Sequence, residues 1–173
     1  NIFLCIDDKY LKSVIPKILR PIVTYGTSEE AQIRAIDINH EGRKVKFKVI
    51  DKKYTKKRFI VSINFPGDHF VRNSLAAIAV ALEYQVSIKD IKNALSKFDG
   101  VGRRYDVYKN INKNKKNLIV IDDYGHHPTE IEAVIKATKK AFPRREINLV
   151  FQPHRYTRTR DCFDDLIRVL QLP

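Results

Sequence analysis

Two short polar stretches of the sequence contain most of the residue types that can do chemistry. The first, IDDYGHHPTE at residues 121–130, places two carboxylates, a tyrosine and two adjacent histidines directly after an apolar run. The second, QPHRYTRTR at residues 152–160, follows another apolar run and supplies one histidine and three arginines. Ligands of open parallel sheets bind beyond the carboxyl ends of the strands, so we predict that both stretches line one crevice.

The residues in these stretches suit an anionic ligand. Arginine presents a planar guanidinium that binds carboxylate or phosphate through parallel hydrogen bonds, and three arginines within six residues favour such a ligand. We predict no metal site, because adjacent histidines on an extended segment point to opposite sides and cannot easily share one ion. The alternative is a capping turn at Asp123, with surface histidines and a solvated basic loop. The candidates are Asp123, His126, His127, His154, Arg155 and Arg158.

Two further motifs lie earlier in the chain. In FPGDHFVRN, residues 65–73, Gly67 permits a tight turn, and His69 and Asn73 stand four apart at the expected start of a helix, where a phosphate or a base edge can bind. In GVGRRYD, residues 100–106, Arg104 belongs to an arginine pair that could reach a phosphate. The alternatives are a plain capping turn for the first motif and a charged linker for the second.

Residues 1–105 are predicted to form strands followed by two helices. The segments 32–38, 43–51 and 58–65 alternate apolar and polar residues, which is typical of half-buried antiparallel strands. Residues 73–84 are predicted to form a helix capped by Asn73 or Ser74, and residues 87–98 a second helix capped by Ser87.

The character of the chain changes after residue 105. We predict a strand at 104–110, a polar turn at 111–117 and a buried strand at 118–122. They are followed by a helix at 128–142, a buried strand at 147–152 and a helix at 159–171. This alternation predicts the start of a parallel α/β unit, so the fold class is α/β with a domain boundary near residues 100–106.

Composition limits the classes of protein that fit. The 173 residues are 43% hydrophobic, with no apolar run near the roughly 20 residues that span a bilayer, so no membrane insertion is expected. Cys5 and Cys162 are too few for a disulfide framework and are predicted to be buried, reduced thiols. The net charge of +13 fits nucleic acid, anionic lipid or an anionic small substrate. No aromatic–basic interleaving or recognition motif appears, so a basic nucleic-acid-binding module stays the alternative.

Taken together, four motifs resemble the Mur ligases, the ATP-dependent amide-bond-forming enzymes of bacterial peptidoglycan synthesis. They occur in the family's order as PGDHFVRNSLAAIAVA, FDGVGRRYD, DDYGHHPTEI and FQPHRYTRTRDCFDD. The resemblance implies that residues 1–105 are the C-terminal part of the central ATP-binding domain, a mixed sheet with helices. Residues 106–173 would then be the first part of a Rossmann-like C-terminal ligase domain. We therefore expect a piece of a longer, cytoplasmic bacterial enzyme.

The resemblance also implies ligands and roles. It implies ATP and Mg²⁺ as cofactors, with UDP-N-acetylmuramate and L-alanine as substrates, and it leaves the oligomeric state open. His69 and Asn73 would contact adenine, Arg104 a phosphate, and Asp123 the ribose or the interdomain linker. Arg104, Asp123 and His126 are the predicted catalytic residues. The residues expected at the amino-acid end are His126, His127, His154, Arg155 and Arg158.

Two features depart from the family pattern. Phe70 stands where the family usually has an asparagine, and the loss of an amide there would weaken contacts to the nucleotide. The phosphate-loop pattern G-x-x-x-x-G-K-[ST] does not occur in these residues, and the magnesium ligands are expected outside them. We therefore expect the chain alone to be inactive, and an inert nucleotide-binding remnant is a further alternative.

Overall fold

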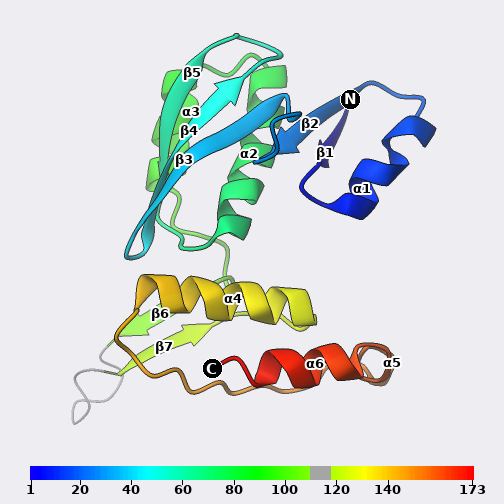
Figure 1. The fold of residues 1–173 in the computed structure, drawn as a ribbon. Helices are drawn as coiled ribbons and strands as arrows, with labels where there is room; N and C mark the ends of the chain where they lie inside the picture. The colour runs from blue at the N-terminus through cyan, green and yellow to red at the C-terminus, as the bar shows by residue number, and fades with distance from the viewer. Residues whose placement is uncertain (110–117) are drawn as a thin grey trace. The chain divides into compact units, whose positions relative to one another are not determined.

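The computed structural model describes residues 1–109 and 118–173 (Figure 1). The chain forms two compact units, Asn1–Phe98 and Asp99–Pro173, which we call unit 1 and unit 2. The polar turn predicted at 111–117 lies outside the described residues.

Unit 1 contains a five-stranded mixed sheet, which agrees with the predicted α/β class. Its strands lie side by side in chain order: β1 (Ile2–Cys5), β2 (Ile22–Gly26), β3 (Ile33–Glu41), β4 (Lys44–Asp51) and β5 (Arg58–Ile63). The first three pair in parallel, and β3, β4 and β5 pair antiparallel, as their alternating sequences predict. Helix α1 (Lys9–Val14) and the 3₁₀ turn Ile15–Lys17 connect β1 to β2, and Pro16 stands in that turn.

The core of unit 1 lies between this sheet and two helices, α2 (Asp68–Glu83) and α3 (Ile88–Lys97) (Figure 1). Along β4, Val45, Phe47 and Val49 are buried, while the intervening lysines face solvent or are only partly covered. Helix α2 adds Leu75 and Ile78, both fully buried. Burial of each such side chain contributes roughly 1.5–3 kcal/mol, so packing on α2 holds the sheet.

The start of α2 corrects one expectation. We predicted a cap at Asn73 or Ser74, but the helix begins at Asp68, five residues before Asn73. Its N-cap is Gly67, whose φ of 105° is a conformation that glycine adopts without strain. The predicted cap of α3 is confirmed, since the Ser87 side chain accepts a hydrogen bond from the Asp90 amide.

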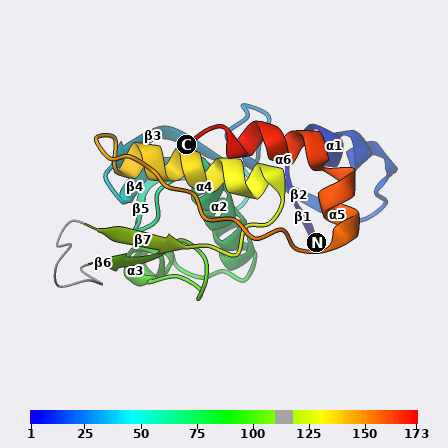
Figure 2. The ribbon, with the colours of Figure 1, turned by 90° about the horizontal axis from the view of Figure 1, so that it is seen from below.

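Unit 2 combines a two-stranded ribbon with three helices. Strands β6 (Asp106–Lys109) and β7 (Ile119–Asp122) pair antiparallel. The helices are α4 (Pro128–Ala141), α5 (Tyr156–Asp161) and α6 (Phe163–Leu170). Helix α4 runs beside α6 (Figures 1 and 2), and the two share a small core of Ile131, Ile135, Leu166 and Val169.

Three expectations for unit 2 were wrong. Residues 147–152 form no strand in the described structure, and Val150 is 97% exposed. Strand β7 is only partly buried, because β6 is its one partner among the described residues and a strand is buried only when neighbours and covering helices enclose it. The helix predicted at 159–171 is divided at Cys162 into α5 and α6.

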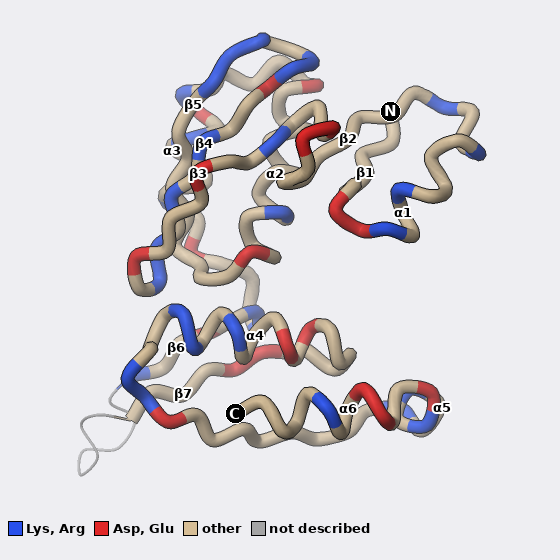
Figure 3. Tube along the Cα trace, viewed as in Figure 1, with Lys and Arg blue, Asp and Glu red and all other residues tan. Residues whose placement is uncertain are grey.

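The basic residues and the two cysteines are distributed over both units. Lysine and arginine occur along most elements and do not gather on one of them (Figure 3). Both cysteines are free thiols, as predicted, but both are partly exposed and not buried. Among the described residues, no helix has the length and apolar content needed to cross a membrane.

Candidate functional site

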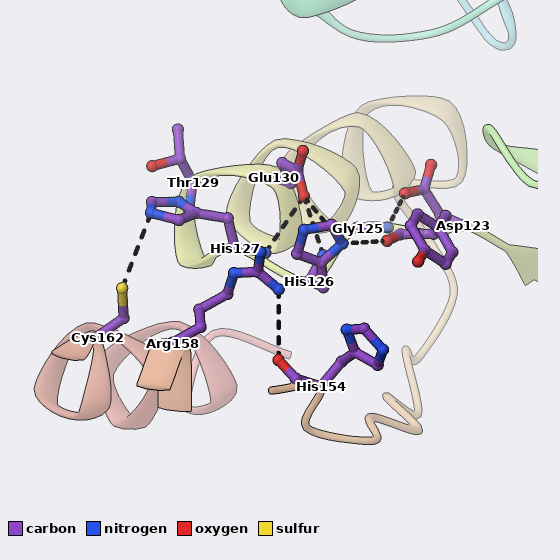
Figure 4. A network of polar contacts seen from close by, with 10 residues as sticks. Asp123, Gly125, His126, His127, Thr129, Glu130, His154, Arg158 and Cys162 are labelled. Carbon is purple, nitrogen blue, oxygen red and sulfur yellow. Dashed lines mark hydrogen bonds and ion pairs between the residues drawn. The ribbon is translucent and has the colours of Figure 1, made fainter. Parts of the chain in front are cut away.

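The loop from β7 to α4 is built around the carboxylate of Asp123. Its Oδ2 accepts a hydrogen bond from the Tyr105 amide at 2.9 Å. Its Oδ1 accepts one from the Gly125 amide at 2.7 Å (Figure 4). Burial raises the pKa of Asp123, and these two hydrogen bonds with the nearby charge of Arg104 oppose the rise without cancelling it. The carboxylate is therefore fixed in place, and the hydrogen bonds from the described residues take up only part of its accepting capacity.

Gly125 is required by the close approach of its neighbours. A Cβ atom at this position would lie 2.9 Å from Asp123 Oδ1 and 3.3 Å from Glu130 Cβ. The first distance is well inside van der Waals contact, so any side chain here would push the loop off the Asp123 carboxylate. Glycine thus sets the narrow spacing between Asp123 and the first turn of α4.

The ring of His126 has a defined proton position. Its Nδ1 lies 3.0 Å from the backbone carbonyl oxygen of Tyr124, which can only accept a hydrogen bond. Nδ1 must therefore donate, so in the neutral ring the lone pair is on Nε2. That nitrogen can accept a proton or a hydrogen bond from a ligand.

His127 carries the opposite tautomer because it caps α4. Its Nδ1 accepts a hydrogen bond from the Thr129 amide at 3.3 Å, so in the neutral ring the proton is on Nε2. That nitrogen lies 3.9 Å from the Cys162 sulfur. The two adjacent histidines thus have different roles. His127 caps the start of α4, and His126 has a ring nitrogen, Nε2, that can accept a hydrogen bond.

The second polar stretch meets the first at the rings of His154 and His126, but the depression found here is lined by residues of 153–163 and by none of 121–130, so it is not the shared crevice that we predicted. The rings of His126 and His154 are 6.3 Å apart between centroids, and Arg158 Nη1 donates to the His154 carbonyl oxygen at 3.3 Å (Figure 4). Arg155 precedes α5 with a φ of 69°, which is uncommon for a residue with a side chain. An open depression of about 590 Å³ is lined by Pro153, His154, Arg155, Tyr156, Thr159, Arg160 and Phe163. The loop 153–155 brings these groups together without the strand that we expected before it.

The arginine pair also belongs to this part of unit 2. The charge of Arg104 acts to lower the pKa of both Asp123 and Glu130, which places its guanidinium near them. The Arg103 guanidinium carbon lies 4.9 Å from the centroid of the Tyr124 ring, a cation–π contact. The motif at 100–106 is therefore more than a charged linker, because its side chains act on the 123–130 loop.

His69 and Asn73 lie in unit 1, on the first turns of α2, four residues apart and so on one face of the helix. Asn73 is exposed, and the His69 ring lies 4.3 Å from the Phe70 ring between centroids. Phe70 in turn lies 4.9 Å from Phe65 and packs against the core. Phe70 is thus a packing residue, and this packing explains why an aromatic side chain stands at the position where the family usually has an asparagine.

Two residues of the site were missed by sequence reasoning. Tyr105 is fully buried and donates its amide to Asp123, and Glu130 accepts the amides of His126 and His127. For Glu130 a signal existed, since an acidic residue three positions after a helix cap is the mark of a capping box. Nothing in the sequence around Tyr105 indicated its burial.

The described residues do not form a metal site. No group of three or more histidine, cysteine, aspartate or glutamate side chains in residues 1–109 and 118–173 could hold a metal ion. The Mg²⁺ implied by the family resemblance therefore has no such group of ligands among the described residues.

The comparisons with known proteins agree with the motifs. The Mur ligase middle domain matches residues 1–81, and the Mur ligase glutamate ligase domain matches residues 103–173. The chain belongs to the Mur ligase family. Where its two domains divide stays a prediction, with residues 1–105 and 106–173 as the proposed ranges.

Among individual relatives, the chain is similar to the UDP-N-acetylmuramate–L-alanine ligase of Hydrogenovibrio crunogenus, with 50% identity over 96% of the chain and 36% of the relative. Its structure resembles UDP-N-acetylmuramate–alanine ligase from Thermotoga maritima, with a TM-score of 0.72 and 28% identity over 87% of this chain and 32% of that one. A murein peptide ligase from Psychrobacter arcticus gives a TM-score of 0.63 and 25% identity over 99% and 35%. The chain spans about a third of the length of these relatives.

Proposed function

We propose that this chain is part of an ATP-dependent ligase that joins L-alanine to the carboxylate of UDP-N-acetylmuramate in peptidoglycan synthesis. The observation that carries the proposal is the 50% identity, over 96% of the chain, to a UDP-N-acetylmuramate–L-alanine ligase. The two polar stretches of the site lie inside that matched length. We propose a bacterial cytoplasmic enzyme that uses Mg²⁺ held by residues outside this chain.

The reaction needs an activated carboxylate and an uncharged amine. ATP supplies the phosphoryl group that turns the muramate carboxylate into an acyl phosphate, and the amine of L-alanine displaces phosphate through a tetrahedral intermediate. An α-amino group is mostly protonated at neutral pH and must lose a proton before it attacks. The chain therefore needs a proton acceptor near the amine and cations near the oxygens that gain charge.

His126 is the proposed proton acceptor, because its Nδ1–H bond to the Tyr124 carbonyl leaves Nε2 free to receive a proton from the ammonium group. Arg155 and Arg158 are the proposed partners of the L-alanine carboxylate, for which a guanidinium has matching geometry. His154, 6.3 Å from His126 between ring centroids, would border the same ligand. His127 would shape this end of the site through the capping of α4.

At the nucleotide end, His69 and Asn73 are the proposed adenine contacts from one face of α2. Arg104 is the proposed phosphate ligand, and Asp123 would meet the ribose or the interdomain linker through the lone pairs that its two hydrogen bonds leave unused. Phe70 replaces an amide of the family, so reduced nucleotide affinity is expected. The chain alone is proposed to be inactive, because the phosphate-loop pattern does not occur in it.

The test is phosphate release by the full-length protein that contains this chain. ATP, Mg²⁺, UDP-N-acetylmuramate and L-alanine are supplied together and then omitted one at a time. Release that needs all four is expected. Folded, full-length protein that releases no phosphate under any condition would contradict the proposal and leave an inert remnant.

A nucleic-acid-binding function is the second candidate, and the net charge of +13 is the observation that favours it. Phosphate contacts release counterions, so such binding would weaken steeply as salt rises. The spread of lysine and arginine over both units gives no single basic face on one element (Figure 3). Binding of nucleic acid at about 50 mM salt, with an affinity that falls on the order of a thousandfold or more by about 200 mM, would favour this candidate, and the absence of binding at low salt would remove it.

A further inference from the structure

Glu130 binds the backbone of both histidines of the loop (Figure 4). Its Oε2 accepts a hydrogen bond from the His126 amide at 3.0 Å and from the His127 amide at 3.2 Å. The same oxygen lies 3.9 Å from His126 Nδ1. One carboxylate thus fixes two consecutive peptide units and faces the ring that the proposed function needs.

We propose that Glu130 is a positioning residue of this site, which acts with Asp123 to clamp the backbone of Gly125, His126 and His127 and so hold the His126 ring beside His154. What His126 then does rests on the proposed function. The clamp itself rests only on the contacts of this loop.

Gly125 shows how closely the two carboxylate residues approach. A Cβ there would lie 2.9 Å from Asp123 Oδ1 and 3.3 Å from Glu130 Cβ, so both residues lie close to the same point beside Gly125. Asp123 takes the Gly125 amide, and Glu130 takes the next two amides along the chain. Three consecutive N–H groups are therefore bound, which leaves this segment little freedom to shift.

The geometry also fixes the His126 ring. The backbone amide of His126 is held by Glu130, and the ring Nδ1 is held by the Tyr124 carbonyl. Loss of the first contact would free the peptide that carries the ring, even with the second contact intact. Displacement of a catalytic group by about 1 Å can cost on the order of a hundredfold in rate, so a small movement here would be visible in kinetics.

The neighbouring acid on α4 behaves differently and supplies a matched control. Glu132 contacts the side chains of Lys136 at 2.6 Å and Arg168 at 3.3 Å. The first contact lies within α4 and the second joins α4 to α6, and neither partner belongs to the loop. If any acidic residue near the start of α4 has the same role, substitution of Glu130 and of Glu132 should have the same effect. If the role is to position the loop, only substitution of Glu130 should have an effect.

The test uses the full-length ligase with Glu130→Gln, Glu130→Asp and Glu132→Asp. Gln keeps the length of the side chain and an oxygen that accepts the two amides, but it has no charge. Asp keeps the charge and is one methylene shorter, so it does not reach. The measurements are kcat, KM for L-alanine, KM for ATP, and hydrogen exchange of the peptide covering residues 122–130.

We expect Glu130→Asp to lower kcat/KM for L-alanine by roughly tenfold to a hundredfold with KM for ATP unchanged, and to speed hydrogen exchange of the peptide. Glu130→Gln should stay close to wild type in both measurements, and Glu132→Asp should change neither. Wild-type kcat/KM for L-alanine and wild-type exchange in Glu130→Asp would overturn the proposal, as would equal effects in Glu132→Asp. A lowered melting temperature with unchanged kcat/KM for L-alanine would also overturn it, because it would indicate a purely structural role.

These readouts separate this proposal from the proposed function. If the wild-type enzyme shows no L-alanine-dependent phosphate release, the function fails, and hydrogen exchange still tests the clamp. If the wild-type enzyme is active, and Glu130→Asp matches it in hydrogen exchange of the peptide and in kcat/KM for L-alanine, only the clamp fails.

Discussion

Two aspartates at strand ends, Asp51 as the last residue of β4 in unit 1 and Asp123 directly after β7 in unit 2, use their carboxylates in different ways. Asp51 is 2% exposed and accepts hydrogen bonds from the amides of Lys53, Tyr54 and Thr55 and from the Thr55 hydroxyl. Within residues 1–109 and 118–173, Asp123 accepts two, from Tyr105 and Gly125. An ionised carboxylate has about four lone-pair positions, so hydrogen bonds from the described residues fill those of Asp51 and about half of those of Asp123.

The pKa values of the two carboxyls follow this difference. Burial acts to raise the pKa of Asp51, but its hydrogen bonds outweigh burial and the pKa is lowered. For Asp123 burial outweighs the two hydrogen bonds and the pKa is raised. A carboxylate with all its acceptors filled fixes a turn, whereas one with free acceptors in a half-buried place can bind a ligand.

The largest effect is expected from Asp123→Ala in the full-length ligase. Loss of both hydrogen bonds and of the free acceptor positions should lower kcat by more than about a hundredfold while the protein stays folded. Turnover measures the loss of kcat, and circular dichroism shows whether the protein stays folded. Asp122→Ala is the control, and its activity should be near wild type, since within the described parts of the chain the Asp122 carboxylate makes only a 3.9 Å ion pair with Arg103. Wild-type turnover in Asp123→Ala would remove Asp123 from the site.

Gly125→Ala should give the next largest effect. The added Cβ would meet Asp123 Oδ1 at 2.9 Å, so the loop must move and kcat/KM for L-alanine should fall by about tenfold or more. Gly102→Ala is a matched control, because no atom lies within 4 Å of a Cβ at that position. Equal activity of the two variants would show that the spacing at Gly125 is not needed.

Asp51→Asn should lower stability without any direct effect on chemistry. The amide nitrogen of asparagine cannot accept from Thr55, and leaving buried donors without partners costs about 1–3 kcal/mol. Urea unfolding of the 173-residue chain measures the loss. Asp37→Asn is the control, because Asp37 is exposed and its single ion pair with Lys48 is worth roughly 0–1 kcal/mol. Equal losses of unfolding free energy in the two variants would mean that the hydrogen bonds of the buried Asp51 carboxylate contribute no more to stability than an exposed ion pair.

The smallest effect is in the pH dependence, where the two aspartates have opposite signs. The contribution of Asp51 to stability is present above its ordinary pKa of 3.8 and is lost as pH falls through its lowered value. That of Asp123 falls as pH rises from 3.8 through its raised value, because the folded state holds that proton more tightly. Carboxyl chemical shifts measured by NMR should place Asp51 below 3.8 and Asp123 above it, and the reverse order would contradict the comparison.

Much of the fold could be predicted because local patterns determine it. The alternation along 43–51 and 58–65 predicted β4 and β5, and the Ser87 cap and Pro128 predicted the starts of α3 and α4. The start of α2 was missed because Gly67, with its positive φ, takes the place of a capping side chain. The strand at 147–152 was wrong because apolar β-prone residues form a strand only where another strand offers its backbone.

The sequence by itself determined the α/β class, strands β3 to β5 and helices α2 and α3 of unit 1 apart from the start of α2, and the membership of Asp123, His126, His154, Arg155 and Arg158 in two polar stretches. Only the tertiary structure decided how these groups act. It gave the two histidines opposite tautomers, filled the acceptors of Asp51 and left those of Asp123 partly free, and placed Glu130 on the loop amides. Residue types fix which hydrogen bonds are possible, but which ones form depends on distances between atoms that lie far apart in the chain or in different elements.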